Sequence, residues 1–371
     1  MARVALALFV LLTLGCGSAA PEEAPGVDLA TASPPCLPAE PPAPAVTLES
    51  AELDPPGPNR ADEPLRATLS LQRAATFLDA TALLWHKRWG CFTCHSNFAY
   101  LMARPALGVD SPAYRAVRAA AEEMVNTTWP SEGPRWDPEV VMGAAALGSG
   151  DAVTGRVQPV TRAALARMWQ LQRSDGQWVW LTQGLPPQES DHHYGVTMAA
   201  IAAALAPEGY SETPEAQAGL ARAREYLQSF PTETLHQRAM LLWADALLGE
   251  RLGLLRAEQR ADIIAALLRT QNEDGGVALP SLGPWERVDG SAQSTESDGY
   301  GTAFVSYVLL KAGLPPSHPM LSRALAWLRS HQRESGRWFT RSASREGPHY
   351  ISHAGTAFAV LALTTACAPP R

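Results

Sequence analysis

The sequence has little charge, no basic excess and, after residue 20, no long hydrophobic run. Only 18% of its 371 residues are charged, and the formal net charge is −7. Because no basic stripe is present to neutralise phosphates, we expect no nucleic-acid partner. Since no apolar run beyond residue 20 is long enough to cross a bilayer, we expect no spanning helix there. What the chain does contain is 46% hydrophobic residues, dominated by Leu and Ala, as in a helical globular protein.

Proline is abundant for a helical protein, with 31 residues, but it is unevenly distributed. Twelve prolines fall between residues 17 and 67, in a segment with almost no aromatic residues. Such a segment cannot bury enough apolar surface to fold. The composition therefore predicts a disordered Pro/Ala/Glu-rich tether of polyproline character over residues 16–67, followed by a globular part over residues 68–366.

The first fifteen residues have the pattern of an export signal. Arg3 precedes an apolar stretch of signal-peptide length, and Gly15 and Cys16 follow it. A small residue before a cysteine is typical of a bacterial lipoprotein signal, so we expect residues 1–15 to be removed and Cys16 to be lipidated. The alternative is an ordinary signal peptide cleaved near Ala19. We expect an exported protein, held to the membrane by its lipid alone and facing the periplasm or the cell exterior.

Export changes the interpretation of the remaining cysteines. Residues 91–95 read Cys-Phe-Thr-Cys-His, the C-x-x-C-H pattern of c-type haem attachment. In that chemistry Cys91 and Cys94 form thioethers with the haem vinyl groups, and His95 supplies an axial imidazole as the proximal iron ligand. A Cys91–Cys94 disulfide and half of a zinc site are the alternatives. Cys36 and Cys367 are then left to pair with each other.

Similar turns recur along the globular part. Residues 171–178, 270–276 and 331–338 each place a glutamine at a predicted helix end and a glycine shortly after it, and two of them add a tryptophan. Each turn is followed by a small-residue helix. The glycines near the starts of these helices are 106 and then 54 residues apart, close to two repeats and one: Gly195, Gly301 and Gly355.

The repeat predicts six helical hairpins. Their first helices are expected near residues 68–86, 111–128, 158–173, 214–229, 256–271 and 319–332. Their second helices are expected to start near residues 95, 138, 192, 236, 298 and 351. Because the second helices are apolar nearly all round, we expect them to be buried inside a ring of first helices. This is an all-α (α/α)6 toroid, and a linear solenoid is the alternative.

The Gln…Gly-x-Trp turns resemble the QW repeats of squalene–hopene cyclases and protein prenyltransferase β-subunits, which form α/α toroids. Residues 87–107 resemble exported bacterial squalene-cyclase-like repeat proteins that carry C-x-x-C-H. The resemblance covers most of residues 68–366 and implies the fold more strongly than an activity. The D-x-D-D acid run of the cyclases does not occur, and no cysteine matches the zinc ligand of the prenyltransferases.

In such a toroid the inner helices run parallel, so their N-termini gather at one rim. Six histidines lie at or near the predicted starts of inner helices: His95, His192, His193, His236, His349 and His353. Across the mouth from His95, His193 or His353 is a candidate distal haem ligand. Asp191, Asp298 and Glu139 also lie near the rim. Asp191 and Asp298 are candidate catalytic acids, and the alternative is that they only cap helices.

These observations support three hypotheses. The first is a toroid with one covalent haem c, in electron transfer with a redox partner protein or in haem-dependent chemistry on an apolar or isoprenoid molecule at the barrel mouth. The second is a metal-dependent or acid-dependent cyclase or lyase that uses Asp191, Asp298 and rim histidines, with zinc as the metal. The third is a scaffold that binds a partner without catalysis.

Overall fold

Helices make up the regular secondary structure of the described chain, which carries no β-strand beyond three isolated bridges. The computed structural model describes residues 37, 40–41, 43–249, 252–345 and 351–368. All of them belong to the unit Pro34–Arg371. No helix among these residues has the combination of length and apolar character that a membrane crossing requires.

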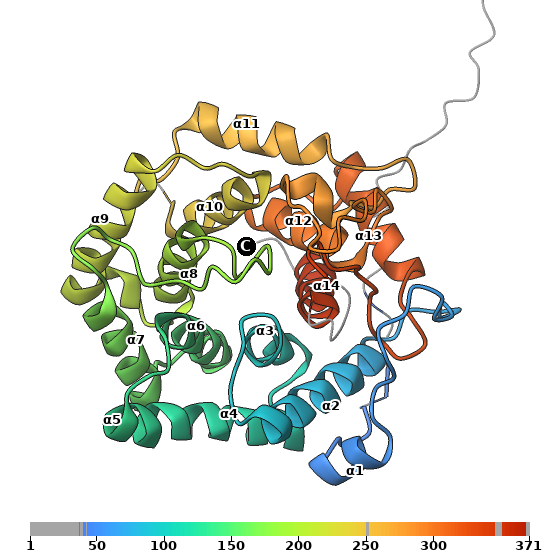
Figure 1. Ribbon diagram of the computed structural model, residues 1–371, viewed down its shortest axis with the longest axis horizontal. Coiled ribbons are helices and arrows are strands. Elements are labelled where there is room, and N and C mark those ends of the chain that lie inside the picture. Colours follow the sequence, from blue (N-terminus) through green and yellow to red (C-terminus); the bar gives the residue numbers. More distant parts are fainter. Residues whose placement is uncertain (1–36, 38–39, 42, 250–251, 346–350, 369–371) are drawn as a thin grey trace, which may run out of the picture. The chain divides into compact units, whose positions relative to one another are not determined.

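Six helices form an inner ring (Figure 1). They are α3 (Asn97–Ala103), α6 (Asp137–Thr154), α8 (His192–Leu205), α10 (Leu235–Leu248), α12 (Gly299–Lys311) and α14 (Ile351–Cys367). Each packs against the next in chain order, and α14 packs against α3, so the ring is closed. Small residues permit this packing: a side chain at Gly355 of α14 would lie 3.0 Å from the backbone nitrogen of Tyr300 in α12.

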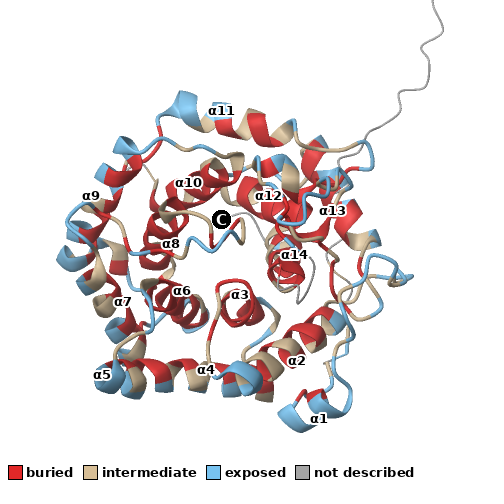
Figure 2. Ribbon diagram, in the orientation of Figure 1, coloured by how far each residue is buried: buried red, intermediate tan, exposed pale blue. Residues whose placement is uncertain are grey.

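The outer ring holds the first helix of each hairpin. Its members are α2 (Leu71–Trp89), α4 (Pro112–Glu123) continued through a π-helical turn (Met124–Thr128) into α5 (Trp129–Glu132), α7 (Pro159–Leu171), α9 (Pro214–Ser229), α11 (Ala257–Leu268) and α13 (Pro319–Ser330). The inner helices are buried almost throughout, whereas the outer helices alternate buried and exposed residues (Figure 2). The prediction of an all-α (α/α)6 toroid is confirmed.

The repeated glutamine joins neighbouring hairpins. In three of the six repeats its Nε2 donates to the carbonyl of the glycine in its own turn. The same Nε2 also donates to a carbonyl at or near the start of the next outer helix: Gln172 to Gly219 (3.0 Å), Gln271 to Met320 (2.8 Å) and Gln332 to Ser70 (2.8 Å). Because Ser70 is the N-cap of α2, the bond from Gln332 joins the last outer turn to the first outer helix.

The turn glycines have positive φ, which a glycine adopts without strain. Gly176, Gly275 and Gly336 have φ of +91°, +93° and +98°. Each presses against the backbone of the next outer helix, and a side chain at Gly336 would lie 2.2 Å from the carbonyl oxygen of Arg73 in α2. The tryptophans are packing residues. Trp338 is fully buried and donates its indole N–H to the carbonyl of Leu328.

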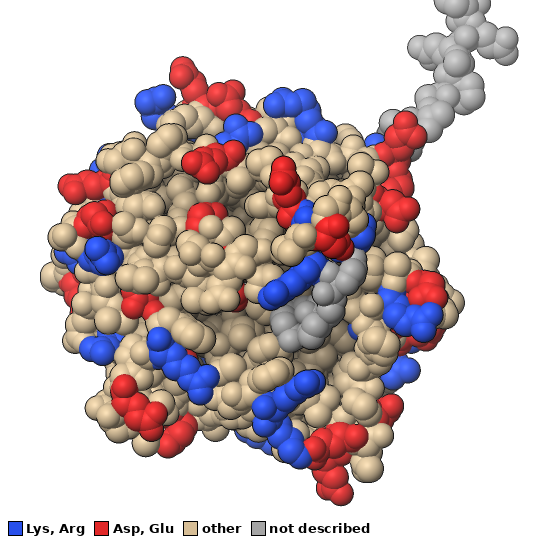
Figure 3. All heavy atoms as spheres, viewed as in Figure 1, with Lys and Arg blue, Asp and Glu red and all other residues tan. Residues whose placement is uncertain are grey.

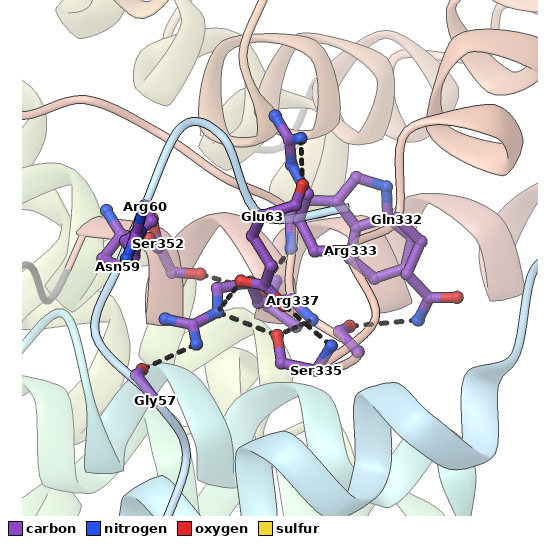
Figure 4. Close-up of polar contacts among 12 residues, drawn as sticks. Gly57, Asn59, Arg60, Glu63, Gln332, Arg333, Ser335, Arg337 and Ser352 are labelled. Carbon is purple, nitrogen blue, oxygen red and sulfur yellow. Dashed lines mark hydrogen bonds and ion pairs between the residues drawn. The ribbon is translucent and has the colours of Figure 1, made fainter. Parts of the chain in front are cut away.

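Part of the predicted tether has a defined structure. Residues 43–67 are structured: they include α1 (Leu48–Leu53) and a strap, residues 57–66, that lies along the last outer turn. Figure 4 shows the strap facing Arg333 and Arg337. Arg337 donates to the carbonyl of Gly57 (2.7 Å) and pairs with Glu63 (3.0 Å), and Arg333 donates to the carbonyl of Glu63 (2.6 Å). An extended proline-rich backbone leaves its carbonyls unbonded within the segment, so the arginines can bind them.

Residues 1–36 lie outside the described chain. The predicted signal peptide, the lipidated Cys16 and the proposed bridge partner Cys36 are among them, as is the first part of the predicted tether.

Replacing Gly336 with alanine should destabilise the protein by about 3 kcal/mol or more, because the new methyl group meets the carbonyl of Arg73 and the positive φ is strained. Gly313→Ala is the matched control. Gly313 has a φ of +91°, but it borders open space, so alanine there should cost only about 1–2 kcal/mol. Urea unfolding of both variants measures the difference. Equal losses would contradict the close contact between the last turn and α2.

Candidate functional site

The first turns of neighbouring inner helices meet at one rim of the toroid. His236, the second residue of α10, places its Nε2 2.9 Å from the hydroxyl of Tyr300, the second residue of α12. The ring of Tyr194, in the first turn of α8, stacks on His236 with centroids 6.1 Å apart. The predicted gathering of inner-helix N-termini is therefore confirmed for α8, α10 and α12.

The C-x-x-C-H segment forms the loop between α2 and α3, beside this rim. Cys91 is partly exposed and Cys94 is buried, and both carry free thiols. Phe92 anchors the loop, since its ring packs against Phe98 of α3 and His86 of α2 with centroids 5.3 Å away in each case. Burial raises the pKa of the Cys94 thiol well above its ordinary value, so the group is neutral.

His95 faces a carboxylate from another hairpin. Its Nδ1 lies 3.5 Å from Oε1 of Glu189, which belongs to the segment before α8. Both side chains are at most 10% exposed. A carboxylate at Nδ1 holds the imidazole proton on that nitrogen, which makes Nε2 the nitrogen suited to a metal. Burial raises the pKa of Glu189 above its ordinary value.

A narrow apolar cavity of about 20 Å³ lies inside the inner ring. Cys94 and Gln188 border it from two loops, and the rest of its wall comes from five inner helices. Those wall residues are Ala99 and Met102 of α3, Met142 of α6, Tyr194 and Met198 of α8, Trp243 of α10, and Ala354, Ala357, Phe358 and Leu361 of α14. The thiol of the C-x-x-C-H loop thus borders an interior rich in methionine and aromatic side chains.

Asp191 and Asp298 both cap helices, as the alternative to a catalytic role predicts. Asp191 accepts from the backbone N–H of Tyr194 (3.0 Å) at the start of α8. Asp298 accepts from the N–H of Gly301 (2.8 Å) and from Thr340 (3.2 Å). Burial raises the pKa of Asp298 to about 7 despite these bonds. The cyclase or lyase function that would use the two acids stays a prediction.

The two predicted distal ligands occupy different surroundings. His193 is 5% exposed, and neither ring nitrogen has a hydrogen-bond partner within the described chain. Burial lowers the pKa of His193 to about 4, so its imidazole is neutral at pH 7. His353 packs its ring edge-on against Phe77 of α2, 5.5 Å away, whereas His95 packs against Trp85 of the same helix. Phe77 and Trp85 are eight residues apart, which is about 12 Å along α2. His353 and His95 therefore contact this helix at well-separated positions.

Other predicted residues give less to the site. His349 lies outside the described residues. Glu139 is buried and accepts from the indole N–H of Trp129 at 2.7 Å. Within the ranges that the structure describes, no three His, Cys, Asp or Glu side chains are grouped so that they could hold a metal ion. The zinc alternative stays a prediction.

Several residues of the rim and cavity were not predicted from the sequence. Glu189 and Tyr300 lie within the repeated segments that precede or open the inner helices, so the repeat itself was the available signal. Gln188 donates to the hydroxyl of Tyr300 (3.3 Å), across two hairpins. Met198 and Trp243 lie on helices that are apolar nearly all round, and such helices do not indicate which residues face the axis.

On the face shown in Figure 3, side chains of both charge signs lie around the margin, and uncharged residues make up most of the centre.

The sequence matches no family model and no curated protein. Among solved structures it is similar to a glycosyl hydrolase family 88 protein from Bacteroides vulgatus. The two chains are 12% identical, the alignment covers 85% of this chain and 83% of the other, and the TM-score is 0.32. So distant a likeness has no bearing on function, and the assignment of the fold rests on the helices themselves.

The buried His236 should make stability depend on pH. Burial lowers its pKa to about 3 from an ordinary 6.5, so between these values the unfolded chain binds a proton that the folded chain does not. Its contribution to stability is therefore complete above pH 6.5 and is lost as the pH falls toward 3. In His236→Phe, the slope of unfolding free energy against pH between 6 and 4 should be lower than in the wild type by up to about 1.4 kcal/mol per pH unit.

The two slopes are measured by urea unfolding at each pH. Because Asp298 and other groups titrate in both proteins, the difference between the slopes reports the contribution of His236. Identical slopes would show that His236 is not held neutral in the folded protein.

Proposed function

We propose that the protein is an exported redox protein that carries one covalent c-type haem at the N-terminal rim of an α/α toroid. Cys91 and Cys94 would hold the porphyrin through thioether bonds, and His95 would be its axial ligand. The observation that carries the proposal is the contact between Nδ1 of His95 and Glu189, because it orients a histidine that directly follows two free thiols.

The donor set fits the group. Two thiols on one loop match the two vinyl groups, and the loop is fixed to α2 and α3 by Phe92. Cys94 borders a cavity whose wall is almost entirely apolar, as the surroundings of a haem need to be. Zinc would call for further nitrogen or sulfur ligands around the same loop.

A bound haem would supply one-electron transfer. The residues of the chain orient and tune it: Glu189 fixes the proton of His95 on Nδ1 and makes the imidazole a stronger donor. Of the two distal candidates, His193 is the better supported, since its imidazole is neutral and has no hydrogen-bond partner among the described residues. His193 follows Glu189 by four residues, so one segment of the chain would supply both side chains.

The proposal includes a location. C-type attachment takes place outside the cytoplasm, and residues 1–16 have the pattern of a lipoprotein signal. The redox partner would then be a protein on the same side of the membrane. Residues 17–42 would connect the lipid to the structured chain that begins near residue 43.

Expression with a c-type maturation system should give a protein whose intact mass includes one haem. Cys91→Ala and Cys94→Ala should each reduce or abolish covalent attachment, because each removes one thioether. Cys367→Ala, at the end of α14, is the matched control and should keep full attachment. Glu189→Gln should keep the haem but raise its midpoint potential, since the weaker imidazole donor stabilises ferric iron less.

Other outcomes identify the alternatives. A folded protein that lacks haem and in which peptide mapping joins Cys91 to Cys94 would indicate the Cys91–Cys94 disulfide. Stoichiometric zinc by elemental analysis would indicate the zinc site. Either result overturns the haem proposal.

Lipidation is tested separately. In a bacterial host with lipoprotein processing, the protein should fractionate with membranes and carry a diacylglycerol mass on Cys16. Cys16→Ala should release it into the soluble exported fraction. Cys36→Ala should leave it at the membrane. A wild-type protein that is cleaved near Ala19 and soluble would contradict lipidation.

A further inference from the structure

A surface groove of about 360 Å³ lies outside the inner ring, where α1 and α4 both pack against α2 (Figure 1). Leu48 and Ala116 in its wall are exposed, so the groove opens to solvent. Seven of its ten wall residues are apolar, so an apolar occupant would be removed from water there. The wall consists of Val46, Thr47 and Leu48 at the start of α1, Leu83, His86 and Lys87 of α2, and Pro112, Ala113, Ala116 and Val117 of α4.

The groove offers no free charge that would select a polar partner. Lys87 is the only charged residue in its wall, and it is paired with Glu52 of α1. Burial lowers the pKa of His86 below its ordinary value, so its imidazole is neutral at pH 7. The groove therefore suits hydrocarbon better than an acidic or basic segment of another protein.

The size of the groove is that of an acyl chain. A methylene group takes up roughly the 30 Å³ that a water molecule occupies in the liquid, so the groove can hold about twelve of them. Each methylene that leaves water for an apolar wall favours binding. A hydrocarbon chain of this length is what lipidation of Cys16 would attach to the protein.

The described chain begins close enough for its own lipid to reach the groove. Leu37, the first described residue, borders the same small cavity as Leu71 at the start of α2. The groove lies beside residues 83–87 of that helix, about 18–24 Å further along it. The 21 residues from Cys16 to Leu37 span up to about 65 Å as an extended polyproline segment. The length of the tether therefore permits a lipid on Cys16 to enter the groove.

We propose that this groove holds an acyl chain of the lipid on the protein's own Cys16. The inference rests on the lipidation that is part of the proposed function. A tether of this length keeps the acyl chain at high effective concentration near the groove, which favours binding within one molecule. The lipidated protein then remains monomeric in water when no bilayer is present, because the groove shields hydrocarbon that would otherwise associate.

Laurate, a fatty acid of twelve carbons, tests the empty groove. The Cys16→Ala protein, exported behind an ordinary signal peptide, carries no lipid and should bind laurate in equilibrium dialysis. Decanoate should bind about tenfold more weakly, because two fewer methylenes leave water. Ala116→Trp in the same protein should weaken laurate binding at least tenfold, since the indole fills the groove from an exposed position. Ala119→Trp is the matched control, because Ala119 is exposed on the same helix but lies outside the wall.

The lipidated wild type, identified by its intact mass, tests the occupant. After detergent is removed, it should remain monomeric by size-exclusion chromatography with light scattering, whereas lipidated Ala116→Trp should aggregate. It should also bind laurate at least tenfold more weakly than the Cys16→Ala protein, because its own acyl chain already occupies the groove.

The contrary outcomes are distinguishable. Absence of laurate binding by the Cys16→Ala protein would show that the groove does not hold acyl chains. Equal binding by the lipidated and unlipidated proteins would show that it holds lipid from another source, and aggregation of the lipidated wild type would show that its lipid is not shielded. Each of these results overturns the inference and leaves lipidation standing. A wild type whose mass includes no lipid would refute both.

Discussion

The toroid depends on a hydrogen bond that spans two hairpins. A glutamine at the end of an outer helix donates from one nitrogen to its own turn and to the next outer helix, and this occurs three times. Such a bond sets the position of each hairpin relative to its neighbour. Since Gln332 bonds to Ser70, the last hairpin meets the first and the ring closes without an exposed terminal repeat. The turn glycines permit this contact, because a side chain at Gly176 or Gly336 would enter the neighbouring backbone.

Closure of the ring has a chemical consequence. Parallel inner helices bring their first turns together, so polar residues far apart in the sequence meet at one rim: Glu189 with His95, and His236 with Tyr300. Behind the rim, the interior is apolar. Burial therefore keeps His193 and His236 neutral and the thiol of Cys94 protonated. A neutral imidazole is the form in which histidine binds a metal, whereas cysteine binds metals as the thiolate, so the protonation of Cys94 disfavours a metal site that uses its sulfur.

The fold was predictable because it repeats. Six hairpins and their approximate starts follow from the spacing of the turns and from the apolar inner helices, and Asp191 and Asp298 were recognisable as possible caps. The strap was missed because proline content predicts an extended chain but not whether its carbonyls meet arginines such as Arg337. The sequence repeat could not predict the contact of His95 with Glu189, because these residues belong to different hairpins that meet only in the folded ring. Likewise, Trp243 and Met198 could not be assigned to the cavity, because every face of their helices is apolar.

Under the proposed function, the rim of the toroid would hold one covalent haem and exchange electrons with a protein outside the membrane. The most direct test of this proposal is the pyridine haemochrome spectrum of the exported protein after extraction with acidified acetone. A c-type spectrum with the haem retained in the protein fraction is the predicted result. A folded protein from a maturation-competent host that retains no haem after extraction would contradict it.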